Sequence, residues 1–232
     1  MRLENLVWDA RDPHRLGRFW TAALGAEQIT DEPDLVEARL DLGDGCFLDL
    51  CFPRVAEPST SPPRLHLDLS GGAGQDDVVA RLLAFGARRV VGQEPAPRAL
   101  LEDPEGGTFR VVPGDGSEGR GGPLAALRLD SADPARDVVL WAEITGWTPG
   151  SSTADAVVLH HPAGVGPRLE LRREPGAKSG KSRLHLDVRR EDGDADPTGR
   201  LLDLGATPLS APGDLLWLVF ADPSGNELCV LG

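Results

Sequence analysis

Two short stretches of the sequence, RLHLDL and RLHLDV, each place a histidine two residues before an aspartate. Residues i and i+2 of a β-strand share a face, so each carboxylate can hydrogen-bond the imidazole and hold it in one tautomer. A histidine held in this way can act as a general base near neutral pH. His66 and His185 are therefore candidate catalytic bases, oriented by Asp68 and Asp187. The alternative is a structural network, because buried polar groups need partners whatever their function.

The two stretches belong to a duplication of the whole chain. His185 follows His66 by 119 residues (185 − 66), and the Asp-Pro dipeptides of LLEDPEGG and FADPSGN are separated by the same 119 (222 − 103). A constant offset of this kind is the signature of a repeat. We therefore predict two domains, residues 1–114 and 123–232, joined by a Gly-rich linker at 115–122.

Each predicted domain divides again into two modules. Gly25 and Gly86 are 61 residues apart (86 − 25), and Gly146 and Gly205 are 59 apart (205 − 146). One module is predicted to contain a strand, a helix, and then two or three strands. An Asp-Pro pair begins the helix, apolar residues recur at helical spacing, and glycine ends it. The predicted fold class is α+β.

The composition narrows the function classes. The 232 residues include 24 basic and 37 acidic side chains, a formal net charge of -13. Nucleic-acid binding requires clustered Lys and Arg, so nucleic acid is not an expected partner. The sequence begins without the apolar region of a signal peptide and has no run approaching about 18 apolar residues, so we expect no membrane association. Three cysteines without metal-finger spacing fit a reducing cytoplasm.

Strand alternation predicts two different faces for each sheet. Leucines alternate with polar residues in the RLHLDL stretch, so the leucines should pack beneath the helices and the polar residues should face the other way. The stretches CFLDLCF and PRLELRR show the same pattern. Each sheet should therefore have one helix-covered face and one mixed polar face that is open to a ligand.

The motifs RFWTAALG, RLHLDL and DPSGN, at these spacings, resemble the vicinal oxygen chelate superfamily. That superfamily includes glyoxalase I, bleomycin-resistance proteins and extradiol dioxygenases, and the closer resemblance is to the glyoxalase-like domains common in bacterial proteins. The resemblance covers nearly the whole chain. It implies two tandem domains, each of two βαβββ modules that form a curved mixed sheet with helices on the outer face. Paired modules then form a cup.

In that superfamily a divalent metal, when present, is held at the floor of the cup by residues of the first and last strands of each module. The repeat offsets carry those positions over to this chain. The first cup would offer Asn5, Asp49, His66 and Arg110, and the second would offer Ala126, Glu170, His185 and Cys229.

The two expected sets differ in their suitability for a metal. Arg110 is a permanent cation in the first cup, where it would pair with Asp49 or with a ligand carboxylate and disfavour a metal. Ala126 removes one ligand from the second cup. We therefore expect no metal cofactor, and the alternative is a zinc-type ion on Glu170, His185 and Cys229. Extradiol dioxygenase chemistry is not expected, because the resemblance would require two histidines and a carboxylate.

The resemblance implies a protein that binds a small apolar or aromatic organic molecule in a cup, for sequestration and resistance or for an uncharacterised activity. Trp217, in DLLWLVF, would face the cup and stack on the ligand, or would simply pack between sheet edges. One alternative is a glyoxalase-type lyase or isomerase that uses a histidine base or a divalent metal in the second domain. Another is a non-catalytic adaptor with vestigial cups. We expect a monomer with internally paired domains or a homodimer.

Overall fold

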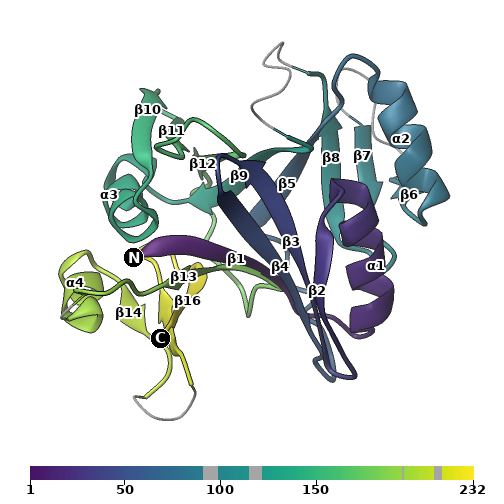
Figure 1. Ribbon diagram of the computed structural model, residues 1–232. Helices are drawn as coiled ribbons and strands as arrows, with labels where there is room; N and C mark the ends of the chain where they lie inside the picture. The colour runs from purple at the N-terminus through teal and green to yellow at the C-terminus, as the bar shows by residue number, and fades with distance from the viewer. Residues whose placement is uncertain (91–98, 115–121, 195, 212–215) are drawn as a thin grey trace.

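The computed structural model describes residues 1–90, 99–114, 122–194, 196–211 and 216–232. Within these residues the chain forms two mixed sheets of eight strands each and four helices (Figure 1). The α+β class with tandem repeated modules is confirmed. The predicted linker at 115–122 lies, apart from its last residue, outside the described residues. No described helix has the length and apolar character needed to cross a membrane.

The first sheet, called sheet I, has the strand order β14-β15-β16-β13-β1-β4-β3-β2. Its strands are β1 (Arg2–Trp8), β2 (Glu27–Glu32), β3 (Leu35–Gly43), β4 (Cys46–Pro53), β13 (Leu184–Arg189), β14 (Thr207–Pro208), β15 (Leu218–Ala221) and β16 (Glu227–Leu231). It therefore combines the first and the fourth module.

The second sheet, called sheet II, has the strand order β10-β11-β12-β9-β5-β8-β7-β6. Its strands are β5 (Leu65–Ser70), β6 (Arg88–Arg89), β7 (Ala99–Glu102), β8 (Thr108–Val112), β9 (Leu124–Ser131), β10 (Thr148–Ser152), β11 (Ala156–His160) and β12 (Arg168–Arg173). It combines the second and the third module.

Both sheets thus cross from one half of the chain to the other. Strand β1 pairs antiparallel with β13, and β5 pairs antiparallel with β9. The prediction that the two modules of one half share a cup is therefore wrong. The repeat offsets show which residues are equivalent, but equivalent strands offer similar hydrogen-bonding edges, so the offsets do not show which strands pair.

The helices are α1 (Pro13–Leu24), α2 (Gln75–Ala84), α3 (Pro134–Thr145) and α4 (Pro197–Asp203). Asp12, Asp133 and Asp196 accept hydrogen bonds from backbone N–H groups of the first turn of α1, α3 and α4, each followed by proline as predicted. Helices α1 and α3 end at Gly25 and Gly146, whose φ values of 64° and 70° lie in the left-handed region that favours glycine.

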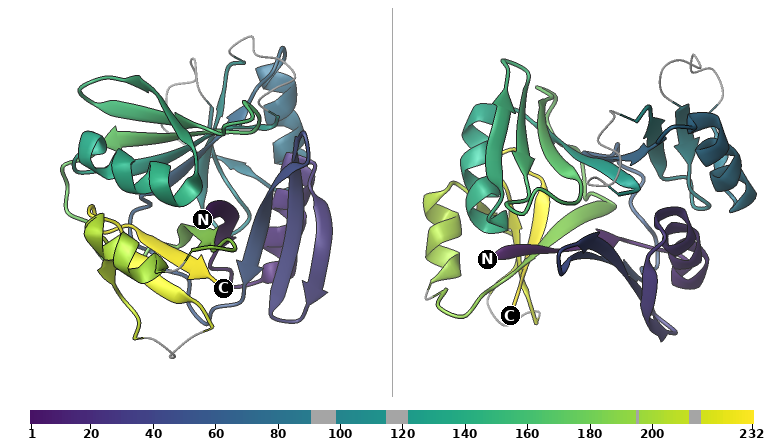
Figure 2. Two further views of the ribbon diagram at one scale, coloured as in Figure 1. Left: turned by 60° about the vertical axis from the view of Figure 1, so that its left-hand side comes forward. Right: turned by 45° about the horizontal axis from the view of Figure 1, so that its top comes forward.

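Each helix lies next to the other helix of the same half of the chain, whereas each sheet combines strands of both halves. Helices α1 and α2 lie together, as do α3 and α4, where Arg200 forms an ion pair with Glu143 (Figure 2). Trp20 of α1 packs on Phe109 of β8 at 5.0 Å between ring centroids, which joins the first module to the second. The two helices of each half therefore lie beside each other, while the sheets connect the halves.

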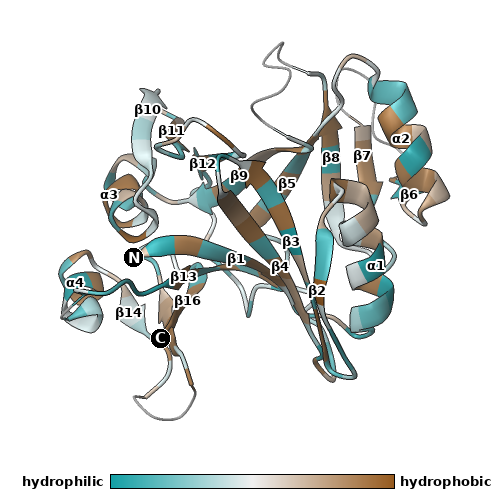
Figure 3. Ribbon diagram, in the orientation of Figure 1, coloured by the Kyte–Doolittle hydropathy of each residue, from teal (hydrophilic) through white to brown (hydrophobic). Residues whose placement is uncertain are grey.

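The core follows the predicted alternation, visible as brown and teal bands along the strands (Figure 3). Trp20 of α1 and Trp141 of α3 lie in this core and are each 1% exposed. A bulge in β1 between Leu3 and Asn5 breaks the period of two, so that Leu3 and Leu6 are both buried although three residues apart. Glu4, the extra residue, ion-pairs with Arg189 of β13 at 2.5 Å.

Two equivalent arginines, 119 residues apart (183 − 64), connect the halves. Arg183 Nη2 lies 2.6 Å from Glu105 Oε2, and Arg183 also donates to the carbonyls of Asp9 and Glu105. Arg64 donates to Asn226 Oδ1 and to the carbonyls of Gly176 and Asp130 in the other half. We call Arg64 and Arg183 the clamp arginines. They bound a cavity of about 400 Å³ that is also lined by Trp20.

Candidate functional site

The open face of sheet I, opposite the helices, carries a continuous row of polar side chains. Asn5 of β1 pairs in the ladders with Asp49 on one side and with Asp187 on the other. Asp187 pairs in turn with Cys229, and Asp49 with Arg39. One row across five strands therefore places an amide, two carboxylates, a thiol and a guanidinium side by side.

Two of these groups, the carboxylate of Asp187 and the thiol of Cys229, form a compact cluster with His185. The ligand atoms of His185, Asp187 and Cys229 all lie within 4.8 Å of one another. His185 Nε2 lies 3.3 Å from Asp187 Oδ1, and Asn5 Nδ2 donates to Asp187 Oδ2 at 3.4 Å. The 3.3 Å contact is an ion-pair distance without the geometry of a hydrogen bond, so among the described residues both His185 Nδ1 and Asp187 Oδ1 are buried without a hydrogen-bond partner. We call His185, Asp187 and Cys229 the sheet I cluster.

The thiols beside this row are held in the neutral form. Burial raises the pKa of the Cys229 thiol, and the Asp187 carboxylate raises it further because a second negative charge would be close. Burial likewise raises the pKa of the Cys51 thiol, with Glu37 adding to the effect. Lys181 lowers the pKa of the Cys229 thiol by less than burial and Asp187 raise it, so neither cysteine has the character of a nucleophile.

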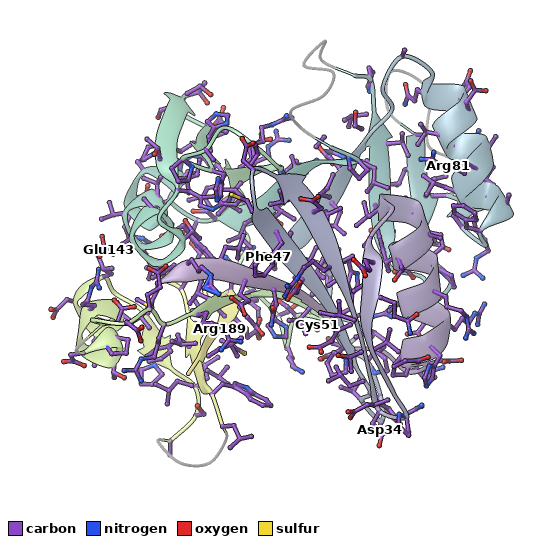
Figure 4. The ribbon with its side chains drawn as sticks, viewed as in Figure 1. Asp34, Phe47, Cys51, Arg81, Glu143 and Arg189 are labelled. Carbon is purple, nitrogen blue, oxygen red and sulfur yellow. The ribbon has the colours of Figure 1, made fainter. Side chains whose placement is uncertain are left out.

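Asp49, one of the expected ligand-binding residues, is already paired. Arg39 donates two hydrogen bonds to Asp49, from Nε to Oδ1 at 2.8 Å and from Nη2 to Oδ2 at 2.7 Å. The same guanidinium lies 3.8 Å from the ring centroid of Phe47, a cation–π contact. Phe47 and Cys51 of β4 and Arg189 of β13 mark this part of sheet I in Figure 4. Arg39 thus neutralises the charge of Asp49, whereas Asp187 contacts the amide of Asn5 and the imidazole of His185.

The open face of sheet II has a different character. Arg110 donates two hydrogen bonds to the carboxylate of Asp68, of 2.7 and 2.5 Å. His66 Nε2 lies 3.3 Å from Asp130 Oδ2, so the expectation that Asp68 orients His66 is wrong. Asp68 and His66 do share a face, but the arginine of the parallel neighbour strand reaches the carboxylate with better geometry.

The structure redistributes the expected site residues between the two faces. Asn5, Asp49, His185 and Cys229 lie on sheet I, and His66, Arg110, Ala126 and Glu170 lie on sheet II. The alternative zinc set of Glu170, His185 and Cys229 is therefore wrong, because Glu170 belongs to the other sheet. The expected pairing of Arg110 with Asp49 fails for the same reason.

The repeat offset also assigned Asn5 to the wrong equivalent residue. The ladders pair Asn5 with Asp49 and Asp68 with Arg110, so Asn5 corresponds to Asp68 and not to His66. The offset used for this assignment came from the glycines that follow the helices. Asn5 precedes Gly25 by 20 residues (25 − 5), whereas Asp68 precedes Gly86 by 18 (86 − 68). Helix α1 has 12 residues and α2 has 10, so an offset measured at the glycine after the helix does not apply to the strand before it.

The donor types allow a metal at only one of the two faces. The sheet I cluster offers an imidazole, a carboxylate and a thiol, all zinc ligands, and two of its buried atoms lack hydrogen-bond partners among the described residues. On sheet II the ladder positions opposite Asp68 and Glu170 hold Arg110 and Arg128, whose charges repel a cation. A divalent ion fits the sheet I cluster and does not fit sheet II.

Sequence reasoning missed Arg39 and Arg128 as members of the open faces. Both alternate with core leucines in their strands, so alternation alone could have placed them there. Trp217, expected to face a cup, lies just before β15 and is 40% exposed.

Comparison with known proteins agrees with this architecture. The family model of the glyoxalase-like domain matches residues 5–112 and 126–231. Glyoxalase I from Zea mays superposes with a TM-score of 0.68 at 17% identity, covering 99% of this chain and 91% of that chain. A "putative dioxygenase" from Bacillus subtilis subsp. subtilis str. 168 gives a TM-score of 0.61 at 16% identity, covering 99% and 84%. No curated protein sequence matches the chain.

At these identities the structural likeness shows the fold alone, while the family model covers most of the sequence twice. Four modules, two mixed sheets and the two matched segments lead to the same conclusion. The chain belongs to the glyoxalase-like domain family of the vicinal oxygen chelate superfamily, as a tandem pair of such domains.

Proposed function

We propose that the protein binds a small organic molecule on the open face of sheet I, at the sheet I cluster. The observation that carries this proposal is the pair of buried atoms, His185 Nδ1 and Asp187 Oδ1, that lack hydrogen-bond partners within the described chain. Leaving a buried polar atom unpaired costs about 1–3 kcal/mol. A ligand that supplies these hydrogen bonds recovers that cost, which favours its binding at this place.

The surroundings indicate the chemical class of the ligand. Val7 pairs with both His185 and Cys51 in the ladders, so an apolar side chain lies within the polar row. Phe47 provides an aromatic ring on the same face. A molecule with an apolar or aromatic body and one or two carbonyl or hydroxyl groups matches this arrangement. Sequestration of such a molecule needs no resident metal, and Arg39 already withdraws Asp49 from any metal ligand set.

The same cluster favours a second candidate function, a lyase or isomerase that depends on a divalent ion. The imidazole of His185, the carboxylate of Asp187 and the thiolate of Cys229 would hold the ion. When bound, the ion would act as a Lewis acid on a substrate oxygen. Asn5 would orient Asp187 through its amide, and Asp49 would stay paired with Arg39 on the next strand.

Two measurements on the intact chain test these functions. The first is a thermal-shift screen with aromatic carbonyl and phenol compounds, comparing the wild type with His185→Ala. We expect hits that raise the melting temperature of the wild type and have at least about tenfold weaker affinity for His185→Ala. His160→Ala is the matched control, because His160 is exposed on β11 of the other sheet. Hits that bind all three proteins equally contradict a site at the sheet I cluster.

The second measurement is calorimetric titration with ZnCl₂ at neutral pH. The metal-dependent candidate requires one ion per chain, with binding lost in both His185→Ala and Cys229→Ser. Binding of organic compounds without zinc binding leaves sequestration as the function. If neither zinc nor any compound binds, the open face of sheet I is not a ligand site, and the non-catalytic adaptor becomes the better hypothesis.

A further inference from the structure

The open face of sheet II is unusual in a chain with a formal net charge of -13. By strand alternation and by their ion pairs, its described charged side chains are Arg88, Arg110, Arg128, Arg168, Arg172, Asp68, Glu102, Asp130 and Glu170. Five guanidinium groups against four carboxylates leave one net positive charge (5 − 4), before any contribution from His66. A cationic face on an acidic protein attracts anions locally.

Arg128 occupies the centre of this face. It lies on β9, opposite His66 of β5 and beside Glu170 of β12. Its side chain is only 11% exposed, and its Nε and Nη1 atoms are buried without a hydrogen-bond partner among the described residues. A buried guanidinium with unused donors is costly to the folded state unless something accepts its hydrogen bonds.

The neighbouring carboxylates do not supply those acceptors. Asp68 Oδ1 lies 3.6 Å from Arg128 Nη1, too far for a hydrogen bond, and both oxygens of Asp68 are engaged by Arg110. Glu170, whose Oε1 lies 3.6 Å from Arg172 Nε, likewise accepts no hydrogen bond from Arg128 Nε or Nη1. Charge attraction is thus present on this face, but the directional hydrogen bonds to Arg128 are not made.

We propose that the open face of sheet II is a binding site for a small anion, held by Arg128 at the centre and Arg172 at the side. A carboxylate or a phosphate group has the acceptor geometry that guanidinium groups recognise. The bound anion would accept hydrogen bonds from Arg128 Nε or Nη1 and would compete with Glu170 for Arg172. The two faces would then take different ligands, an anion on sheet II and the molecule proposed above on sheet I.

Calorimetric titration with inorganic phosphate and with malonate, at low ionic strength, tests the site. These probes separate the two anion classes, and we expect one or both to bind saturably with a dissociation constant of about 0.1–1 mM. Arg128→Gln should weaken that binding at least about tenfold. Arg88→Gln is the matched control, because Arg88 is an exposed arginine of the same sheet that pairs with Glu102 at 3.5 Å.

Glu170→Gln provides a readout that misfolding cannot imitate. Removing this carboxylate takes away a competitor for Arg172, so anion affinity should rise about three- to tenfold. His185→Ala should leave anion affinity unchanged, which keeps this test separate from that of sheet I. Absence of binding by both probes, equal affinity in Arg128→Gln and wild type, or weaker binding by Glu170→Gln would each overturn the proposal.

Discussion

Replacing Arg183 by alanine tests whether the two halves are held together as the structure shows. Arg183 makes three hydrogen bonds to the first half, including the 2.6 Å charge-assisted contact with Glu105. The Arg183 and Glu105 side chains are 17% and 9% exposed. Glu105 also accepts the backbone N–H groups of Arg11 and Asp12, at the start of α1.

The magnitude follows from this burial. Removing one partner of a buried ion pair costs about 3–5 kcal/mol, because the remaining charge stays buried without compensation. Glu105 keeps two backbone donors, which places the expected loss near the lower end, at about 3 kcal/mol. Arg88→Ala is the control, since its partner Glu102 lies 3.5 Å away and Arg88 is 58% exposed. An exposed pair of this kind contributes about 0–1 kcal/mol.

Urea denaturation monitored by tryptophan fluorescence measures the difference in the free energy of unfolding. An m value of about 2–3 kcal/mol/M converts a loss of about 3 kcal/mol into a midpoint lowered by about 1–1.5 M. Glu105→Gln and the double variant complete a double-mutant cycle that isolates the coupling between the two side chains. A loss for Arg183→Ala no greater than that of Arg88→Ala would refute the view that this contact connects the halves.

Three further outcomes follow from the same structure. Burial raises the pKa of the Asp222 carboxyl, so the folded state binds a proton at this carboxyl more tightly than the unfolded chain does. The contribution of Asp222 to the free energy of unfolding therefore falls as pH rises from the ordinary pKa of 3.8 through the raised pKa. In urea denaturation series across that range, the stability of the wild type relative to Asp222→Asn should decline with pH, and a rise would contradict the assignment. Cys46 is only partly buried, whereas Cys229 is buried with a raised pKa, so Cys46 should react with a thiol reagent at pH 8 well before Cys229, as mass spectrometry of the labelled peptides would show. Asp12→Ala should lower the free energy of unfolding by about 1 kcal/mol, because Asp12 Oδ1 accepts the Arg15 N–H at the start of α1; no loss in denaturation would show that the cap is unimportant.

Much of the fold could be predicted because local signals repeat four times along the chain. Asp-Pro and glycine signals identified the starts of three helices and the ends of α1 and α3. Strand alternation separated the core leucines from the open faces. These features depend on a few neighbouring residues, whose preferences act wherever the segment lies in space.

The composition of each site could not be predicted in the same way. The choice of β13 over β5 as the partner of β1 depends on how the two halves dock, and contacts such as those of Arg183 decide it. Because the sequence analysis paired the modules within each half, it assigned residues of two different sheets to one set of metal ligands. The carboxylates of Asp103 and Asp222 show the same limit. Their Asp-Pro dipeptides marked the repeat, but their hydrogen bonds to the indoles of Trp20 and Trp141 span more than 80 residues of sequence.

The pairing of β1 with β13 determines the order in which the two sheets can form during synthesis on the ribosome. Sheet II is assembled from one continuous stretch, Leu65–Arg173, so its strands emerge one after another and can associate early. The first strand must wait for a neighbour made about 180 residues later. Until then, β1 and β4 form half a sheet with an unpaired edge, a surface prone to association with other chains. A chaperone that shields this edge during synthesis would therefore raise the yield of correctly closed molecules.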